Sequence, residues 1–299
     1  MFSRTRLAIA ASLATLVCSH PAFAADCSSI AGLALDKGRV TAATLVEAGK
    51  FTPPAAPGGP PPGVMGGQYA NLPAFCRVEA TLEPTADSSI KVEVWLPAEG
   101  WNGKYVGIGN GIWAGQLSLS QLASPLSRGF AAATTDTGHS GSGLTAEWAV
   151  GHPEKLVDFG YRSMHEMAVH SKTIIRSYYQ RAPALSYYEG CSTGGRQGLM
   201  EAQRFPEDFD AIIAGAPVNN MFNVSAAQMH SMVSILSDQS LYLPPDKVQL
   251  LHNAVLAACE SVDGINDGFL NNPLACKFDP QTLQCSATVT TACLTPRQV

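Results

Sequence analysis

The segment Tyr188-Glu189-Gly190-Cys191-Ser192-Thr193-Gly194-Gly195-Arg196 contains a Gly-x-Ser-x-Gly motif. It follows a β-rich run at residues 185–189 and precedes an amphipathic helical pattern that extends to Arg204. A strand, a tight turn and a helix form the context in which a nucleophilic serine is lifted out of the backbone. Gly190 and Gly194 flank the turn, where larger side chains would clash. We therefore predict Ser192 as a nucleophile and the backbone N–H of Thr193 as an oxyanion donor.

A second glycine-rich segment, residues 109–115, directly follows a buried-strand pattern at residues 104–108. A loop of this kind after an early strand of the sheet supplies the second oxyanion N–H in many serine hydrolases. Phosphate binding is the alternative, but the loop lacks a Gly-Lys-Ser/Thr ending and contains no basic residue. We predict Gly111 as the second donor.

Strand patterns at residues 77–82, 90–96, 104–108, 129–135, 185–189 and 211–214 alternate with helical patterns at 158–181 and 196–204. This order predicts an α/β protein of the α/β-hydrolase fold with parallel central strands. Residues 25–50 show one short helical pattern, and the Pro/Gly-rich residues 51–67 predict an extended surface loop. We assign residues 25–216 to the hydrolase core and residues 217–299, which include helical patterns at 219–237 and 245–259, to an inserted lid domain.

The N-terminus has the pattern of a secretion signal over residues 1–24, with Arg4 and Arg6, an apolar stretch and the cleavage sequence Ala22-Phe23-Ala24. The 299-residue chain is 46% hydrophobic and 14% charged, with a net charge of −5. This balance gives no basic surface for nucleic acid, and no later segment is long and apolar enough to span a membrane. We expect a secreted or periplasmic protein, and the sequence leaves its oligomeric state open.

Export favours disulfide bonds, and seven cysteines follow the signal. Three pairs are natural partners: Cys27 with Cys76, Cys259 with Cys276, and Cys285 with Cys293. Because the number is odd, one thiol lacks a partner, and Cys191, beside the predicted nucleophile, is the remaining residue.

Residues 259–269, Cys-Glu-Ser-Val-Asp-Gly-Ile-Asn-Asp-Gly-Phe, place three carboxylates among glycine turns. Carboxylate and carbonyl oxygens are the ligands that Ca²⁺ prefers, although the spacing is not that of an EF-hand. Composition alone fits a solvated acidic turn equally well.

Four segments carry a family signature: residues 190–196, 204–210 (Arg-Phe-Pro-x-x-Phe-Asp), 215–217 (Gly-Ala-Pro) and 263–268 (Asp-Gly-x-x-Asp-Gly). Together they resemble the tannase/feruloyl esterase family, which includes the hydrolase of mono(2-hydroxyethyl) terephthalate. The resemblance covers essentially all of the chain after the signal. It implies that Ser192 is the nucleophile, that Thr193 and Gly111 are the oxyanion donors, and that the same three disulfides form. It also implies a structural calcium site in the lid, with Glu260 at a position where the family has Asp; the ligands would be Glu260, Asp263, Asp267 and the carbonyls of Ile265 and Phe269.

In this family a cysteine next to the nucleophile is bonded to a cysteine that follows the catalytic histidine. The chain contains no His-Cys pair, so the resemblance implies that the partner of Cys191 lies beyond residue 299. We therefore expect an N-terminal fragment that ends inside the lid and lacks the triad Asp and His. The seven histidines that are present are expected to have structural roles.

The leading hypothesis is a secreted serine esterase that cleaves aryl esters, such as feruloyl or galloyl esters, through an acyl-enzyme. The sequence does not choose among these small aromatic substrates. The alternative is a non-catalytic, calcium-stabilised extracellular binding protein or an inactive truncated hydrolase. A lipase or peptidase with the same elbow is disfavoured, because the lid lacks a broad apolar stripe.

Overall fold

The computed structural model describes residues 26–54, 66–141 and 143–299. The chain divides after Asn219 into two compact units, called here the N-terminal unit and the C-terminal unit (residues 220–299). The secretion signal and most of the Pro/Gly-rich loop predicted at residues 51–67 lie outside the described residues. No helix in the described part of the chain has both the length and the apolar character needed to cross a membrane.

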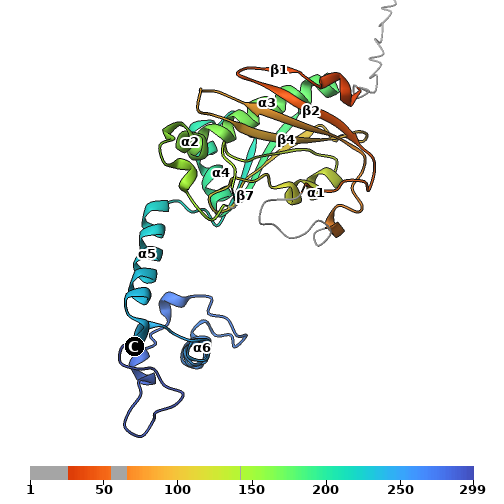
Figure 1. Ribbon diagram of the computed structural model, residues 1–299. Helices are drawn as coiled ribbons and strands as arrows, with labels where there is room; N and C mark the ends of the chain where they lie inside the picture. The colour runs from red at the N-terminus through yellow and green to blue at the C-terminus, as the bar shows by residue number, and fades with distance from the viewer. Residues whose placement is uncertain (1–25, 55–65, 142) are drawn as a thin grey trace, which may run out of the picture. The chain divides into compact units, whose positions relative to one another are not determined.

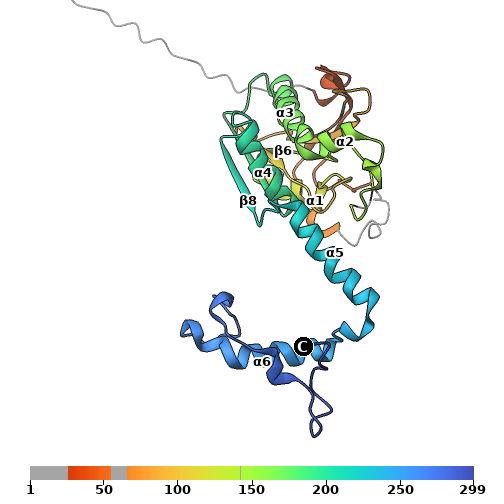
Figure 2. The ribbon, with the colours of Figure 1, turned by 90° about the vertical axis from the view of Figure 1, so that its left-hand side faces the viewer.

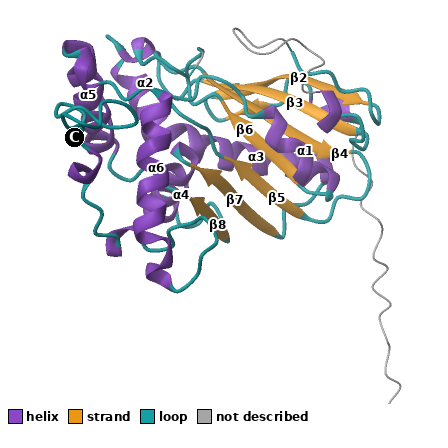
Figure 3. Cartoon of the chain, turned by 90° about the horizontal axis from the view of Figure 1, so that it is seen from below, coloured by secondary structure: helices purple, strands orange, loops and turns teal. Residues whose placement is uncertain are grey.

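The N-terminal unit contains an eight-stranded sheet with the order β1-β2-β3-β4-β6-β5-β7-β8 (Figures 1 and 3). The strands from β1 to β4 pair antiparallel, β4 also pairs antiparallel with β6, and β5, β6, β7 and β8 are parallel neighbours. The strands are β1 (Ala34–Leu35), β2 (Gly38–Val46), β3 (Phe75–Leu82), β4 (Ile90–Pro97), β5 (Lys104–Ile108), β6 (Ala131–Thr135), β7 (Leu185–Cys191) and β8 (Ala211–Gly215). The expected parallel strands are therefore present, and they form the half of the sheet from β6 to β8.

Four helices belong to this unit: α1 (Leu119–Ser127), α2 (Pro153–Val157), α3 (Ser163–Tyr179) and α4 (Thr193–Arg204). Helix α1 packs against β4, β5 and β6, α3 contacts the same three strands, and α4 contacts β7 and β8. Figure 2 shows α3 and α4 near one another, and the two helices are in contact.

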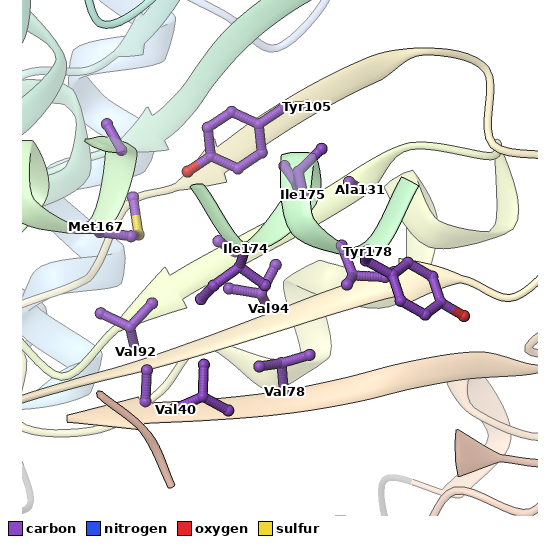
Figure 4. Close-up of a cluster of buried hydrophobic side chains, with 14 of the residues drawn as sticks. Val40, Val78, Val92, Val94, Tyr105, Ala131, Met167, Ile174, Ile175 and Tyr178 are labelled. Atoms are coloured by element: carbon purple, nitrogen blue, oxygen red, sulfur yellow. The ribbon is translucent and has the colours of Figure 1, made fainter. Parts of the chain in front are cut away.

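The core lies on both faces of the sheet, as the alternation of side chains along the strands requires. On one face, Val92 and Val94 of β4 pack with Ile174 of α3 (Figure 4). On the other face, Trp95 packs with Leu122 and Leu126 of α1. Helices α1 and α3 thus cover opposite faces of the same strands.

One expectation about local structure is wrong, and one predicted helix is confirmed with small changes at its ends. The described residues 26–50 contain the strands β1 and β2 and a 3-10 turn at Cys27–Ile30, in place of a short helical pattern. Thr and Val favour a strand, and pairing with β3 decides the outcome. The helix expected over 158–181 begins as a π-helical turn at Asp158–Arg162, continues as α3 and ends at Tyr179, because Gln180 has a left-handed φ of 56°.

The C-terminal unit contains α5 (Met221–Ser237), α6 (Pro245–Cys259) and short 3-10 turns. Disulfide bonds join Cys259 to Cys276 and Cys285 to Cys293, and a third joins Cys27 to Cys76 in the N-terminal unit. All three predicted disulfides are therefore present. Cys191 has a free, exposed thiol.

Candidate active site

Ser192 lies between the end of β7 and the start of α4, with φ of 60° and ψ of −116°. A positive φ is strained for a residue with a side chain. The turn is tight because a Cβ at Gly190 would come within 2.6 Å of the Gly194 carbonyl carbon, and a Cβ at Gly195 would overlap the Gly215 oxygen. Small residues are therefore required at these positions, and they allow the turn to expose the serine.

The Ser192 side chain is exposed, and its backbone N–H donates to the Gly215 carbonyl at 3.0 Å. Thr193 is the first residue of α4, so its N–H belongs to the helix end that attracts negative charge. An exposed hydroxyl next to such an end suits attack on a carbonyl carbon followed by stabilisation of the oxyanion.

The backbone of residues 109–115 turns sharply after β5, with positive φ at Ile112 (51°) and Ala114 (59°). Asn110 N–H donates to Gln197 Oε1 at 3.0 Å, and Trp113 N–H donates to the Gly143 carbonyl at 3.1 Å. The N–H groups of Gly111 and Ile112 have no hydrogen-bond acceptor in the described part of the protein. Gly111, predicted from sequence, is therefore available as a donor.

Ile112 is a second available donor that sequence reasoning missed. A β-branched residue rarely adopts positive φ, and nothing in the sequence signals that this one does. The Thr193 hydroxyl donates to the Ile112 carbonyl at 2.7 Å and so ties the loop to the elbow. The structure thus brings Ser192, Thr193 and Gly111 into one region.

A cavity of about 280 Å³ lies beside this loop. Its lining includes residues 110–112 and four polar residues just before and at the start of α1, namely Gln116, Ser118, Ser120 and Gln121. A larger groove of about 620 Å³ runs along β5, β7 and β8 on the face covered in part by α1.

The four histidines among the described residues of the N-terminal unit all contact other groups. Nδ1 of His152 lies 2.8 Å from Asp87, Nδ1 of His165 lies 2.6 Å from Asp208, and Nε2 of His170 lies 3.0 Å from Glu166. Nε2 of His139 lies 2.7 Å from the Trp113 carbonyl oxygen. Within the described residues of this unit, no histidine forms a hydrogen bond with the Ser192 hydroxyl.

Two carboxyl groups of the N-terminal unit, those of Asp136 and Glu201, are buried. Asp136 accepts hydrogen bonds from the N–H groups of Gly138 and Lys91, and burial raises its pKa to about 7. Glu201 of α4 has no exposed surface, and burial, with the nearby Asp208 carboxylate, raises its pKa. Their burial gives both groups a structural role in the core.

The carboxylates of the acidic loop in the C-terminal unit accept hydrogen bonds from backbone N–H groups of the same loop. Glu260 accepts from Gly268 N–H at 2.6 Å, Asp263 from Ile265 N–H at 3.0 Å, and Asp267 from Phe269 N–H at 3.1 Å. In the described residues no three His, Cys, Asp or Glu side chains form a ready-made metal cluster. The donor chemistry fits Ca²⁺, because three carboxylates and the carbonyls of Ile265 and Phe269 stand in one disulfide-closed loop.

A family model described as tannase and feruloyl esterase matches residues 76–299. The chain belongs to the tannase and feruloyl esterase family. An uncharacterized esterase of Xanthomonas campestris pv. campestris is 38% identical over 296 residues, which are 99% of this chain and 49% of that protein. A probable feruloyl esterase B-1 of Aspergillus flavus is 35% identical over 75% of this chain and 42% of its own length.

The solved structure of feruloyl esterase B from Aspergillus oryzae superimposes with a TM-score of 0.80 at 30% identity. The match covers 91% of this chain and 53% of that one. The chain therefore spans about half the length of the relatives it matches.

Proposed function

We propose that this member of the tannase and feruloyl esterase family supplies the nucleophile and the oxyanion donors of a secreted serine carboxylic ester hydrolase. The observation that carries the proposal is the exposed Ser192 on a strained turn, linked through the Thr193 hydroxyl to a loop in which two N–H groups have no acceptor among the described residues. The names of the relatives support aryl esters of the feruloyl or galloyl type as substrates.

In the proposed reaction, Ser192 Oγ attacks the ester carbonyl carbon while its proton passes to a base. The N–H groups of Thr193 and of Gly111 or Ile112 stabilise the oxyanion that forms. The oxyanion collapses, the alcohol leaves with a proton, and the acyl group remains on Ser192. Water then cleaves this second ester, which releases the aromatic acid and restores the serine hydroxyl. Since the four described histidines of the N-terminal unit contact other groups, the base in this proposal is a group other than these.

The same proposal assigns a role to each unit and to the acidic loop. The N-terminal unit acts as an α/β-hydrolase core, and the C-terminal unit as a lid domain. Ca²⁺ would be held by Glu260, Asp263 and Asp267 with the carbonyls of Ile265 and Phe269, where a cation supplies charge neutralisation for the loop. The disulfide bonds support export, because such bonds persist in oxidising compartments.

The test compares the native protein that contains this chain with its Ser192→Ala variant on methyl ferulate, methyl gallate and a long-chain 4-nitrophenyl ester. We expect hydrolysis of an aromatic acid ester and a loss of at least about a thousandfold in the variant. Unchanged hydrolysis in the variant would exclude Ser192 as the nucleophile. A preference for the long-chain ester would point to a lipase.

A further inference from the structure

The loop at residues 109–115 must be held in a conformation that its sequence does not favour. Ile112 and Ala114 both have positive φ, although each carries a side chain. Such a conformation costs on the order of 1–3 kcal/mol per residue and persists only where surrounding contacts impose it. The contacts that impose it therefore decide where the free N–H groups of Gly111 and Ile112 point.

His139 provides one of these contacts from the loop that follows β6. Its side chain is 4% exposed, and its Nε2 lies 2.7 Å from the Trp113 carbonyl oxygen. Because a carbonyl only accepts, Nε2 must carry the hydrogen, and Nδ1 is left to accept from the Thr137 hydroxyl at 3.4 Å. The ring stacks on Trp148 at 3.7 Å, and burial lowers the pKa of His139. One neutral tautomer is thus fixed in place.

Two successive peptide groups of the loop are held at both ends. The peptide between Trp113 and Ala114 accepts from His139 through its oxygen and donates through Ala114 N–H to the Gly111 carbonyl at 2.9 Å. The peptide between Ile112 and Trp113 accepts from the Thr193 hydroxyl at 2.7 Å and donates to Gly143 at 3.1 Å. The two preceding N–H groups, those of Gly111 and Ile112, remain without an acceptor in the described residues.

We infer that His139 is a positioning residue that, together with the Thr193 hydroxyl, orients the oxyanion loop through a hydrogen bond from Nε2–H to the Trp113 carbonyl. This inference rests on the proposed function for its consequence in catalysis, since the oriented N–H groups are the proposed oxyanion donors. The rival explanation is that the ring only fills space between Trp148 and Gly115, where a Cβ would lie 3.1 Å from the His139 ring.

Two substitutions separate the hydrogen bond from the ring. His139→Gln retains a side-chain N–H donor and loses the aromatic ring, whereas His139→Phe retains a stacking ring and loses the donor. Hydrogen exchange of the Trp113 and Ala114 amides reports the order of the loop. The rate at which a fluorophosphonate modifies Ser192 shows whether a change in the order of the loop alters the reactivity of the serine.

We expect His139→Phe to accelerate exchange of these amides by roughly 3- to 10-fold, the effect of one lost hydrogen bond. We expect it to slow modification of Ser192 by about tenfold, and His139→Gln to stay within about threefold of wild type in both measurements. The inference is overturned if His139→Phe behaves as wild type, or if both variants are impaired to the same extent.

A second pair of variants tests the other contact and stands in if the His139 variants do not fold. Thr193→Ser retains the hydroxyl that donates to Ile112, and Thr193→Val removes it. Only the valine variant should loosen the Trp113 and Ala114 amides, and equal exchange in both would contradict the inference. If wild-type Ser192 is never modified, the proposed function fails, while the exchange measurements still decide the role of His139.

Discussion

The N-terminal unit buries side chains on both faces of an eight-stranded sheet, whereas in the C-terminal unit only Cys259, Cys293 and Leu294 are buried. Helix α5 of the C-terminal unit exposes large apolar side chains, with Phe222 at 81% and Leu236 at 70%. The first unit is therefore held by apolar burial, and the second by two disulfides and local hydrogen bonds. The Gly-x-Ser-x-Gly turn at Ser192 belongs to the unit with the large core.

The two units should differ most in the loss of unfolding free energy when a leucine is truncated to alanine. Leu126 of α1 is fully buried, and Leu126→Ala should cost about 2–5 kcal/mol of unfolding free energy. Leu236→Ala in α5 should change stability by less than about 0.5 kcal/mol. Urea denaturation followed by fluorescence measures both. Similar losses would show that α5 is buried in solution and would break the contrast.

The C-terminal unit, which buries few side chains, should depend on its two disulfides. Replacing Cys259 and Cys276 with serine opens a loop with a separation of 17 residues and should destabilise that unit by about 3 kcal/mol. The bond from Cys285 to Cys293, with a separation of 8, should contribute slightly less, about 2.5 kcal/mol. Limited proteolysis distinguishes the two units. Faster cleavage within residues 26–219 than within 220–299 would contradict the division of stabilising forces.

Calcium should act on the same unit. At a Ca²⁺ concentration about 100 times its dissociation constant, binding should add about 2.7 kcal/mol to the stability of the C-terminal unit. Asp263→Asn should abolish the shift in melting temperature between Ca²⁺ and EDTA, and Asp246→Asn, outside the acidic loop, should leave it. If melting does not respond to Ca²⁺ in the wild-type protein, the calcium proposal is wrong.

Glu201 tests the core of the N-terminal unit, because it is an ionisable group buried there. Its folded pKa is raised by burial above the ordinary value of 4.5, so the folded state keeps a proton that the unfolded chain releases. The contribution of Glu201 to stability is therefore greatest below pH 4.5 and falls as pH rises through the window between the two pKa values. Glu201→Gln removes this dependence and should gain about 1 kcal/mol or more at pH 8 relative to pH 5. Glu207→Gln, at an exposed position, is the control, and a parallel shift in both variants would refute the assignment.

Much of the site could be predicted from sequence because its signals are local. The turn at Ser192 depends on neighbouring glycines. The strand that precedes it is predicted by its own β-rich sequence. What could not be predicted depends on contacts between distant segments. Strand β2 forms because it pairs with β3. The orientation of the Ile112 N–H depends on a backbone conformation that the Thr193 hydroxyl helps to hold. The inferred role of His139 depends on a carbonyl 26 residues earlier in the chain.

The most direct test of the central claim is mass spectrometry of the native protein that contains this chain after reaction with a fluorophosphonate. We predict a single adduct on the peptide that contains Ser192, absent in Ser192→Ala and retained in Cys191→Ala, which removes the neighbouring exposed thiol. An adduct that persists in Ser192→Ala, or no adduct in the wild-type protein, would contradict the assignment of Ser192 as the nucleophile.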